Sequence, residues 1–286
     1  MRRMLARLWR AKFPIAAILV LLAVTGAAAF APEIAPRDPN RQSIIARLVP
    51  PLTANRQGRI DFILGSDGLG RDIASRLVYG ARVTIVVGLA AVLIGGALGT
   101  LLGVLAGYRG GAAGAVIMRV ADIQLAFPFI LLAIMVLVVL GPGLLNLILV
   151  LGVGQWVTYA RIARAQTLAV SQKEYVEAAR AIGARHARIL RRTVLPNIAA
   201  PLIVVASFNL AGVILSEAAL SFLGLGVPPT VPSWGGMLAE SRDQLLAGRW
   251  WMAVLPGLAI ALTALSCNVL GDWLRDELDP RLKDAG

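Results

Sequence analysis

Lys173–Pro201 reads KEYVEAARAIGARHARILRRTVLPNIAAP, a polar and basic segment between two long apolar runs. Apolar residues in its first third recur at helical spacing, which predicts a short helix with one apolar face. Gly183 is expected to end that helix, because glycine is unfavourable inside helices and common just after them. A second helical piece is expected over His186–Val194, and Leu195-Pro196 is expected to end it because proline cannot donate a hydrogen bond within a helix. The segment therefore predicts a helix, a hinge and a second helix that leads into the next apolar run.

Apolar residues dominate the composition: 58% of the 286 residues are hydrophobic and only 15% are charged. Soluble domains average about 45–50% apolar and about 25% charged residues, so we expect a membrane protein without a sizeable soluble domain. The one cysteine, Cys267, excludes a disulfide within the chain and a cysteine-based metal site. The one histidine, His186, lies in the basic segment and is expected to be a solvated surface residue. No catalytic residue and no metal site is predicted.

Uncharged runs predict an all-α, polytopic fold with six transmembrane helices, since one span needs about 20 residues. Ile123–Ala160 is too long for one span, and Gly141-Pro142-Gly143 is expected to divide it into two helices joined by a tight outer turn. The spans are expected in Phe13–Ala31, Val83–Tyr108, the two halves of Ile123–Ala160, the part of Asn197–Ala239 that precedes Val227–Pro232, and Trp250–Gly271. The three prolines of Val227–Pro232 are expected to end the fifth span. The first is interpreted as an uncleaved signal-anchor helix rather than a signal peptide.

The basic residues predict the orientation of the chain. The formal net charge is +12, and the positive residues cluster beside apolar runs, which favours loops retained in the cytoplasm over binding to nucleic acid. Met1–Lys12 carries five basic residues, and Arg161–Pro196 carries eight basic and two acidic residues, so both are expected inside. With six spans, both termini lie on the same side as Glu177. The short connection Arg109–Arg119 is also expected inside.

A fixed pattern of residues runs through the basic segment. Glu177-Ala178-Ala179 is followed by Gly183 after three residues and, further on, by Leu195-Pro196. This spacing resembles the EAA signature of the inner-membrane permeases of ATP-driven, binding-protein-dependent importers; Thr193 departs from it, where the signature has an apolar residue. The resemblance implies that these residues dock a cytoplasmic ATPase. A basic amphipathic helix resting on anionic headgroups is the alternative interpretation.

Four further stretches resemble one subfamily of these permeases, namely the shorter partner of the permease pair in dipeptide, oligopeptide and nickel importers. They are Leu64–Arg82, Ser216–Gly226, Ser233–Leu238 and Leu278–Leu282, of which Ser233–Leu238 resembles the family's outer re-entrant segment. The resemblance implies peptides or related small solutes as cargo, and alternating access driven by ATP as the mechanism. It implies as partners a second permease, two ATP-binding subunits, a periplasmic or lipid-anchored substrate-binding protein, and membrane lipids of the inner membrane.

The expected organisation follows from the spans and the resemblance together. Residues 1–31 are the N-terminal tail and first helix, and residues 32–82 are a periplasmic loop. Residues 83–271 are the permease domain, which contains the cytoplasmic coupling loop 161–196, and residues 272–286 are a cytoplasmic tail.

Glu217 is the one charged residue within Asn197–Ala239. A carboxylate within a membrane run is a functional candidate by default. We expect a structural role for it, in which it pairs with a partner subunit or backbone groups, somewhat more than contact with substrate.

ATP binding by this chain is not expected. Its lysines are Lys12, Lys173 and Lys283, and none follows a glycine, so the chain lacks a phosphate-binding loop of the G-x-x-x-x-G-K-[ST] type. ATP and magnesium are therefore expected on partner subunits, with no cofactor in this chain and no enzyme activity of its own. A secondary transporter driven by an ion gradient is the alternative, although Glu217 is the only intramembrane carboxylate it could use. An intramembrane enzyme would need a nucleophile–base pair or a metal cluster, which the sequence does not offer.

A glycine stripe and two polar residues at a helix end also allow predictions about helix packing. Gly95, Gly99, Gly103 and Gly107 recur every four residues, which predicts a flat stripe for close helix packing rather than a ligand site. Asp122 and Gln124 lie at the inner mouth of the third expected helix, where they could contact the basic segment, a partner or water.

Overall fold

The computed structural model describes residues 2–278 and, for side chains, residues from Lys12 onward; over this part of the chain it contains helices and no strands. The predicted all-α fold is confirmed. In order, the elements are α1 Arg2–Ala29, α2 Ala31–Ile34, η1 Ile44–Ala46, α3 Ile73–Arg109, α4 Gly111–Leu125, α5 Phe129–Leu140, α6 Leu144–Gly154, α7 Trp156–Ser171, α8 Glu174–Ala181, α9 His186–Ile189, the π-helix η2 Leu190–Val194, α10 Leu195–Phe222, α11 Trp234–Leu246 and α12 Trp251–Leu278.

Within the described residues, five helical stretches are long and apolar enough to cross a membrane. They are Lys12–Ala29, Ile73–Arg109, Leu144–Ser171, His186–Phe222 and Trp251–Leu278. The pair α4 and α5 passes the same test jointly but is bent by 86°, and it would be the sixth span. The bend lies at Pro128, which precedes α5 and restricts the residue before it to extended conformations. The predicted number of six spans is therefore reached only if the bent pair of α4 and α5 is counted as one span.

Two predicted loops are wrong in their boundaries. The expected periplasmic loop ends too late, because α3 begins at Ile73 and not at Val83. The side chain of Asp72 caps α3 by accepting from the backbone N–H of Ser75, and the charged side chains in the first turns of α3 hid this start from a search for uncharged runs. The expected loop Arg109–Arg119 is replaced by a turn at Gly110, after which α4 starts at once.

The coupling loop is also more helical than predicted. Helix α7 continues to Ser171, past the expected loop start at Arg161. Leu195-Pro196 does not end a helix, because the chain passes from η2 directly into α10. Pro196 lies in the first turn of α10, where proline is tolerated because the first N–H groups of an α-helix have no partner within that helix. The turn at Gly141-Pro142-Gly143 is confirmed between α5 and α6. Ser233 caps α11, so the stretch Ser233–Leu238 forms the cap and the first turn of a regular helix.

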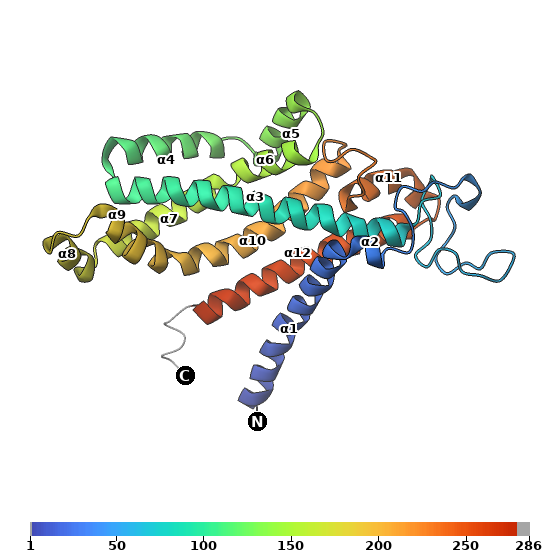
Figure 1. Ribbon diagram of the computed structural model, residues 1–286, viewed down its shortest axis with the longest axis horizontal. Coiled ribbons are helices and arrows are strands. Elements are labelled where there is room, and N and C mark those ends of the chain that lie inside the picture. Colours follow the sequence, from blue (N-terminus) through green and yellow to red (C-terminus); the bar gives the residue numbers. More distant parts are fainter. Residues whose placement is uncertain (1, 279–286) are drawn as a thin grey trace.

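Helix α3 runs through the middle of the bundle and packs along α6 and α7, with α10 and α12 beside it (Figure 1). The glycine stripe makes this possible. A Cβ atom on Gly99 would lie 2.2 Å from the carbonyl oxygen of Trp156, and one on Gly103 would lie 2.3 Å from that of Ala160. The backbones of α3 and α7 therefore touch, and the predicted packing role of the stripe is confirmed.

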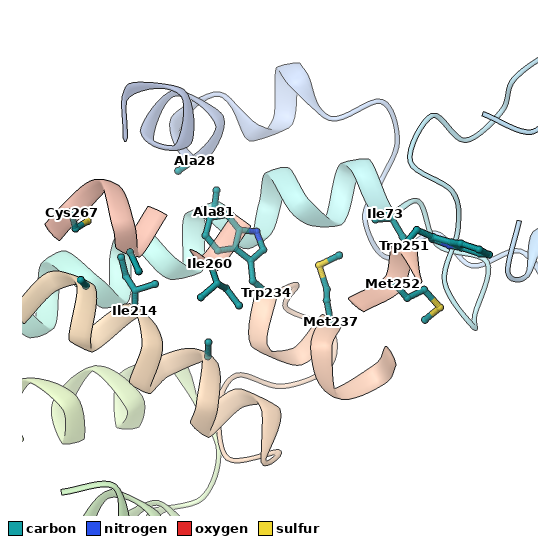
Figure 2. Close-up of a cluster of buried hydrophobic side chains, with 13 residues drawn as sticks. Ala28, Ile73, Ala81, Ile214, Trp234, Met237, Trp251, Met252, Ile260 and Cys267 are labelled. Atoms are coloured by element: carbon teal, nitrogen blue, oxygen red, sulfur yellow. The ribbon is translucent and has the colours of Figure 1, made fainter. Parts of the chain in front are cut away.

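The segment between α2 and α3 lies at one end of the bundle, and α8 and α9 lie at the other (Figure 1). A buried apolar cluster supports the first of these ends. It joins α1, α3, α10, α11 and α12 through residues that include Ala28, Ala81, Ile214, Trp234 and Ile260 (Figure 2). The indole N–H of Trp234 donates to the carbonyl oxygen of Leu77 at 2.9 Å, which satisfies its one polar atom within the cluster.

Candidate functional site

Helix α8 carries the Glu177-Ala178-Ala179 pattern and ends in a tight glycine cap. Gly183 adopts a φ of +79°, its N–H donates to the carbonyl of Arg180, and the N–H of Ala184 donates to that of Ala179. This pair of bonds is the Schellman arrangement, which favours glycine because the left-handed conformation is strained for other residues. The predicted hinge is thus a rigid turn of defined geometry.

The apolar face of α8 is only partly buried, contrary to the simple amphipathic expectation. Val176 is fully buried, whereas Tyr175 is exposed and Ile182 is 85% exposed. Val176 packs in a cluster with Ile189, Val194 and other apolar residues of α7, η2 and α10. The outward surface therefore combines Glu177, Ala178 and an exposed isoleucine, a composition suited to contact with another protein.

The predicted docking residues fall on two elements. Glu177, Ala178 and Ala179 lie on α8 with Gly183 as its cap, whereas Leu195 and Pro196 open α10. The elements are joined through the buried cluster around Val176, which also contains Ile198 of α10. Glu177 forms no ion pair with any side chain between Lys12 and Leu278.

Helices α8 and α9 are also tied to the end of α3. The hydroxyl of Tyr108 lies 2.9 Å from Nδ1 of His186, and the guanidinium of Arg180 lies 5.6 Å from the centre of the Tyr108 ring. His186 is exposed, as predicted, but it has a protein partner. Three separate segments thus meet at Tyr108.

Asp122 and Gln124 lie near the end of α4, which is the third expected span, and both bind neighbouring helices. Asp122 pairs with Arg161 of α7 at 2.6 Å, and both side chains are about half exposed. The amide of Gln124 donates to the carbonyl of Gly154 at 2.8 Å and accepts from the indole N–H of Trp156 at 2.6 Å. Gln124 therefore bridges the end of α4 and the break between α6 and α7.

Glu217 lies inside the subunit. Its side chain is 1% exposed, Oε1 accepts from the hydroxyl of Ser221 at 2.7 Å, and Oε2 has no hydrogen-bond partner in the described part of the chain. A Cβ atom on Gly235 would lie 2.4 Å from the carbonyl of Ala218, so the first turn of α11 lies directly against this part of α10. Glu217 therefore forms a hydrogen bond with Ser221 inside the subunit and is not exposed at the surface of the subunit.

A charged cluster at the opposite end was not predicted. Oδ2 of Asp67 accepts from Nε of Arg71 at 2.6 Å and from Nη1 of Arg76 at 2.5 Å. Oε2 of Glu240 accepts from Nη2 of Arg71 at 2.7 Å and from Nη1 of Arg76 at 2.5 Å. Asp67, Arg71 and Arg76 are almost fully buried, whereas the Glu240 side chain is 31% exposed. Two positive and two negative groups balance, which is the condition for burying charge.

The environment of Asp67 shows why its charge is tolerated. Burial alone raises the pKa of Asp67, but the N–H of Arg71 and the guanidinium groups of Arg76 and Arg71 outweigh it and hold that pKa below its ordinary value. The surrounding stretch, Leu64–Asp72, is Gly-rich and by local pattern alone indicates only a turn. The Asp67–Arg71 spacing was visible, but nothing local connects it to Glu240.

The Gly-rich stretch also anchors the segment between α2 and α3, which the sequence predicts to lie outside and which we call the outer segment. The hydroxyl of Ser66 donates to the carbonyl of Ala46, and the N–H of Ser43 donates to the carbonyl of Leu69 at 3.1 Å. Gly70 has a φ of +75°, and a Cβ atom there would lie 1.9 Å from the carbonyl oxygen of Ser43, so glycine is required. The outer segment is thus fixed to the start of α3 and, through the charged cluster, to α11.

Residues 99–284 match the protein family described as "Binding-protein-dependent transport system inner membrane component". The chain belongs to this family. The permease is 45% identical over 268 residues to the di/tripeptide transport system permease protein DppC of Pseudomonas aeruginosa, covering 94% of this chain and 88% of that protein. It is 38% identical to the dipeptide transport system permease protein DppC of Bacillus subtilis, covering 97% and 84%, respectively.

Solved structures agree on the fold. The permease superposes on an inward-facing conformation of the MetNI methionine ABC transporter with a TM-score of 0.59 at 20% sequence identity, covering 71% of this chain and 96% of that chain. The predicted assignment to the inner-membrane permeases of binding-protein-dependent importers is therefore confirmed, and so is the membrane location. The family is a transport component and not a catalytic subunit.

Proposed function

We propose that this permease is one of two related membrane subunits of an ABC importer for short peptides. The observation that carries the proposal is the 45% identity to a di/tripeptide permease, because it extends over 94% of the chain, both ends of the bundle included. Nothing in the comparisons favours the alternative of a secondary ion-coupled transporter. ATP and magnesium belong, in this proposal, to two separate cytoplasmic subunits, and a periplasmic or lipid-anchored binding protein delivers the peptide.

The docking surface for an ATPase subunit is the exposed side of α8. Glu177 offers a carboxylate that has no ion-pair partner among the described side chains, Ala178 permits close approach, and Ile182 supplies an apolar contact. The Gly183 cap keeps α8 as a rigid unit, and buried Val176 connects it to η2 and α10. Closure of the ATPases would therefore displace α8 and, with it, the start of a membrane helix, which is the differential contact that alternating access requires.

The proposed topology places α8 and both termini in the cytoplasm and the segment between α2 and α3 outside. In support, the start of α1 and the end of α12 lie toward the α8 side of the bundle, away from that segment (Figure 1). The test uses single cysteines in a Cys267→Ala background, namely Glu174→Cys on α8 and Arg56→Cys on the outer segment. A membrane-impermeant maleimide added to intact cells should label only Arg56→Cys. Labelling of Glu174→Cys alone would reverse the topology and refute the docking role.

The transport function is tested with the purified complex in liposomes. Uptake of a radiolabelled dipeptide should require the binding protein outside and ATP inside, and it should stop when the ATPase subunits carry an inactivated catalytic residue. Peptide uptake that persists without ATP and follows an imposed proton gradient would overturn the proposal in favour of a secondary transporter.

A further inference from the structure

The segment that joins α8 to α10 presents three arginines that the docking proposal does not use. Arg188, Arg191 and Arg192 are exposed, and together with Ala187 they line a hollow of about 450 Å³. None of them forms an ion pair with any side chain in the described range from Lys12 to Leu278. Two other basic residues in this half of the bundle have partners, since Arg161 pairs with Asp122 and Arg180 lies over the ring of Tyr108.

The backbone fixes the direction of these arginines. Ile189, Val194 and Ile198 are all fully buried, although the first two are five positions apart. A regular α-helix would place residues at that spacing on nearly opposite faces. The π-helix η2 widens the turn between them, so that the apolar residues share the buried side while the arginines stay on the outer side. The cluster is therefore held together by the fold even though like charges at this spacing repel each other.

The position of the cluster indicates the ligand. The arginines immediately precede α10, within the candidate span His186–Phe222. Exposed apolar surface begins with Leu195, which is 39% exposed, and continues at Ile203, which is 50% exposed. Positive side chains at the boundary between a polar segment and apolar surface lie at the level of lipid headgroups. Guanidinium groups are suited to phosphate because their donors match its oxygens in pairs.

We propose that Arg188, Arg191 and Arg192 form a binding site for the phosphate of an anionic phospholipid headgroup. The lipid would neutralise the three positive charges and hold the junction of η2 and α10 at the membrane surface. This site does not depend on the proposed peptide cargo or on which ATPase binds α8. The same phosphate chemistry would be offered by free phosphate, and the experiment separates the two sources.

The experiment uses the purified complex in detergent, to which phosphatidylglycerol or phosphatidylcholine is added, and counts retained lipids by native mass spectrometry. The test variant is the triple Arg188→Gln, Arg191→Gln and Arg192→Gln. The control is Arg41→Gln, Arg56→Gln and Arg59→Gln, which removes equal charge from exposed positions of the outer segment. Since each arginine near an anionic surface contributes about fivefold in affinity, we expect retention of phosphatidylglycerol to fall about a hundredfold in the test variant and little in the control.

Three further outcomes are decisive. The triple Arg→Lys variant, which keeps the charge but not the paired donors, should retain lipid at a level between the wild type and the glutamine triple, and it shows that the segment still folds. Inorganic phosphate at millimolar concentration should not displace the lipid; displacement would assign the site to free phosphate and overturn the lipid proposal. Unchanged lipid retention in the glutamine triple, together with loss of the ATPase subunits, would overturn it in favour of a protein partner's carboxylates.

Discussion

Nη2 of Arg71 donates to Oε2 of Glu240 at 2.7 Å, although the two residues are 169 positions apart in the chain. The contact joins the Gly-rich stretch before α3 to the middle of α11. Arg76 and Asp67 complete the cluster on its buried side. The outer segment of the permease is consequently part of the bundle and not a loose loop.

Glu240→Gln should destabilise this end of the protein. The change leaves two buried guanidinium groups with a single carboxylate, Asp67. Breaking a fully buried pair costs about 3–5 kcal/mol, and we expect about 2 kcal/mol here because Glu240 is partly exposed. Limited proteolysis of the outer segment and thermal unfolding of the purified complex measure the effect. Asp243→Asn, on the exposed side of the same helix, is the matched control, and equal behaviour of the two variants would contradict a role for the cluster.

The same cluster predicts a pH dependence. The pKa of Asp67 is lower in the folded protein than its ordinary value of 3.8, so its stabilising contribution is complete above that value. The contribution should be lost as the pH falls from about 3.8 through the lower, folded pKa. Protease sensitivity of the outer segment should therefore be constant from pH 7 to 5 and rise only in strong acid. In Asp67→Asn it should be high at every pH; a transition near neutral pH in the wild type would show that another group controls it.

Gly183→Trp should separate ATP hydrolysis from transport. A side chain at Gly183 meets open space but is strained by its φ of +79°, so the cap of α8 would be altered without a steric clash inside the bundle. Gly183→Asn is the control, because asparagine tolerates the left-handed conformation. We expect normal subunit assembly, with peptide uptake reduced at least tenfold in the tryptophan variant and roughly twofold in the asparagine variant. Normal uptake with normal ATPase stimulation in Gly183→Trp would refute the proposal that closure of the ATPases moves α8 as a rigid unit.

Gly99→Ala and Gly96→Ala form a matched pair that tests the contact of α3 with α7. The added Cβ would lie 2.2 Å from the carbonyl of Trp156 at position 99 but 3.5 Å from the ring of Tyr159 at position 96. Overpacking costs about 1–3 kcal/mol, so Gly99→Ala should lower the melting temperature and the amount of assembled complex. Gly96→Ala should behave like the wild type. The same loss in both variants would mean that helix flexibility, not contact, matters.

Glu217→Gln and Glu217→Leu distinguish a structural from a transport role. Glutamine keeps an acceptor for Ser221 at the same place, whereas leucine leaves that buried hydroxyl without its partner. If the role is structural, the glutamine variant should assemble and transport normally, and the leucine variant should lose about 1–3 kcal/mol of stability. Normal assembly with no peptide uptake in Glu217→Gln would instead assign Glu217 to the transport cycle. Melting curves and liposome uptake are measured on the same preparations.

Several features were predictable because they depend on neighbouring residues. The cap at Gly183, the turn at Gly141-Pro142-Gly143 and the packing role of the glycine stripe were all read from local patterns. The start of α3 was misplaced because Arg76 and Arg82 interrupt the uncharged run, although the Asp72 cap was present in the sequence. The exposure of Ile182 could not be predicted, because helical periodicity identifies the apolar face of a helix but not whether other parts of the chain cover that face.

Hydropathy and helical periodicity are local properties, so the residues alone were enough to predict an all-helical membrane protein with a basic, helix-forming loop. The 86° bend between α4 and α5, the enclosure of Glu217 within the subunit and the contact of Asp67, Arg71 and Arg76 with Glu240 became visible only in the folded chain. The physical reason is that a buried charge is stable only beside its partners, and the partners here come from helices that approach one another after the chain has folded.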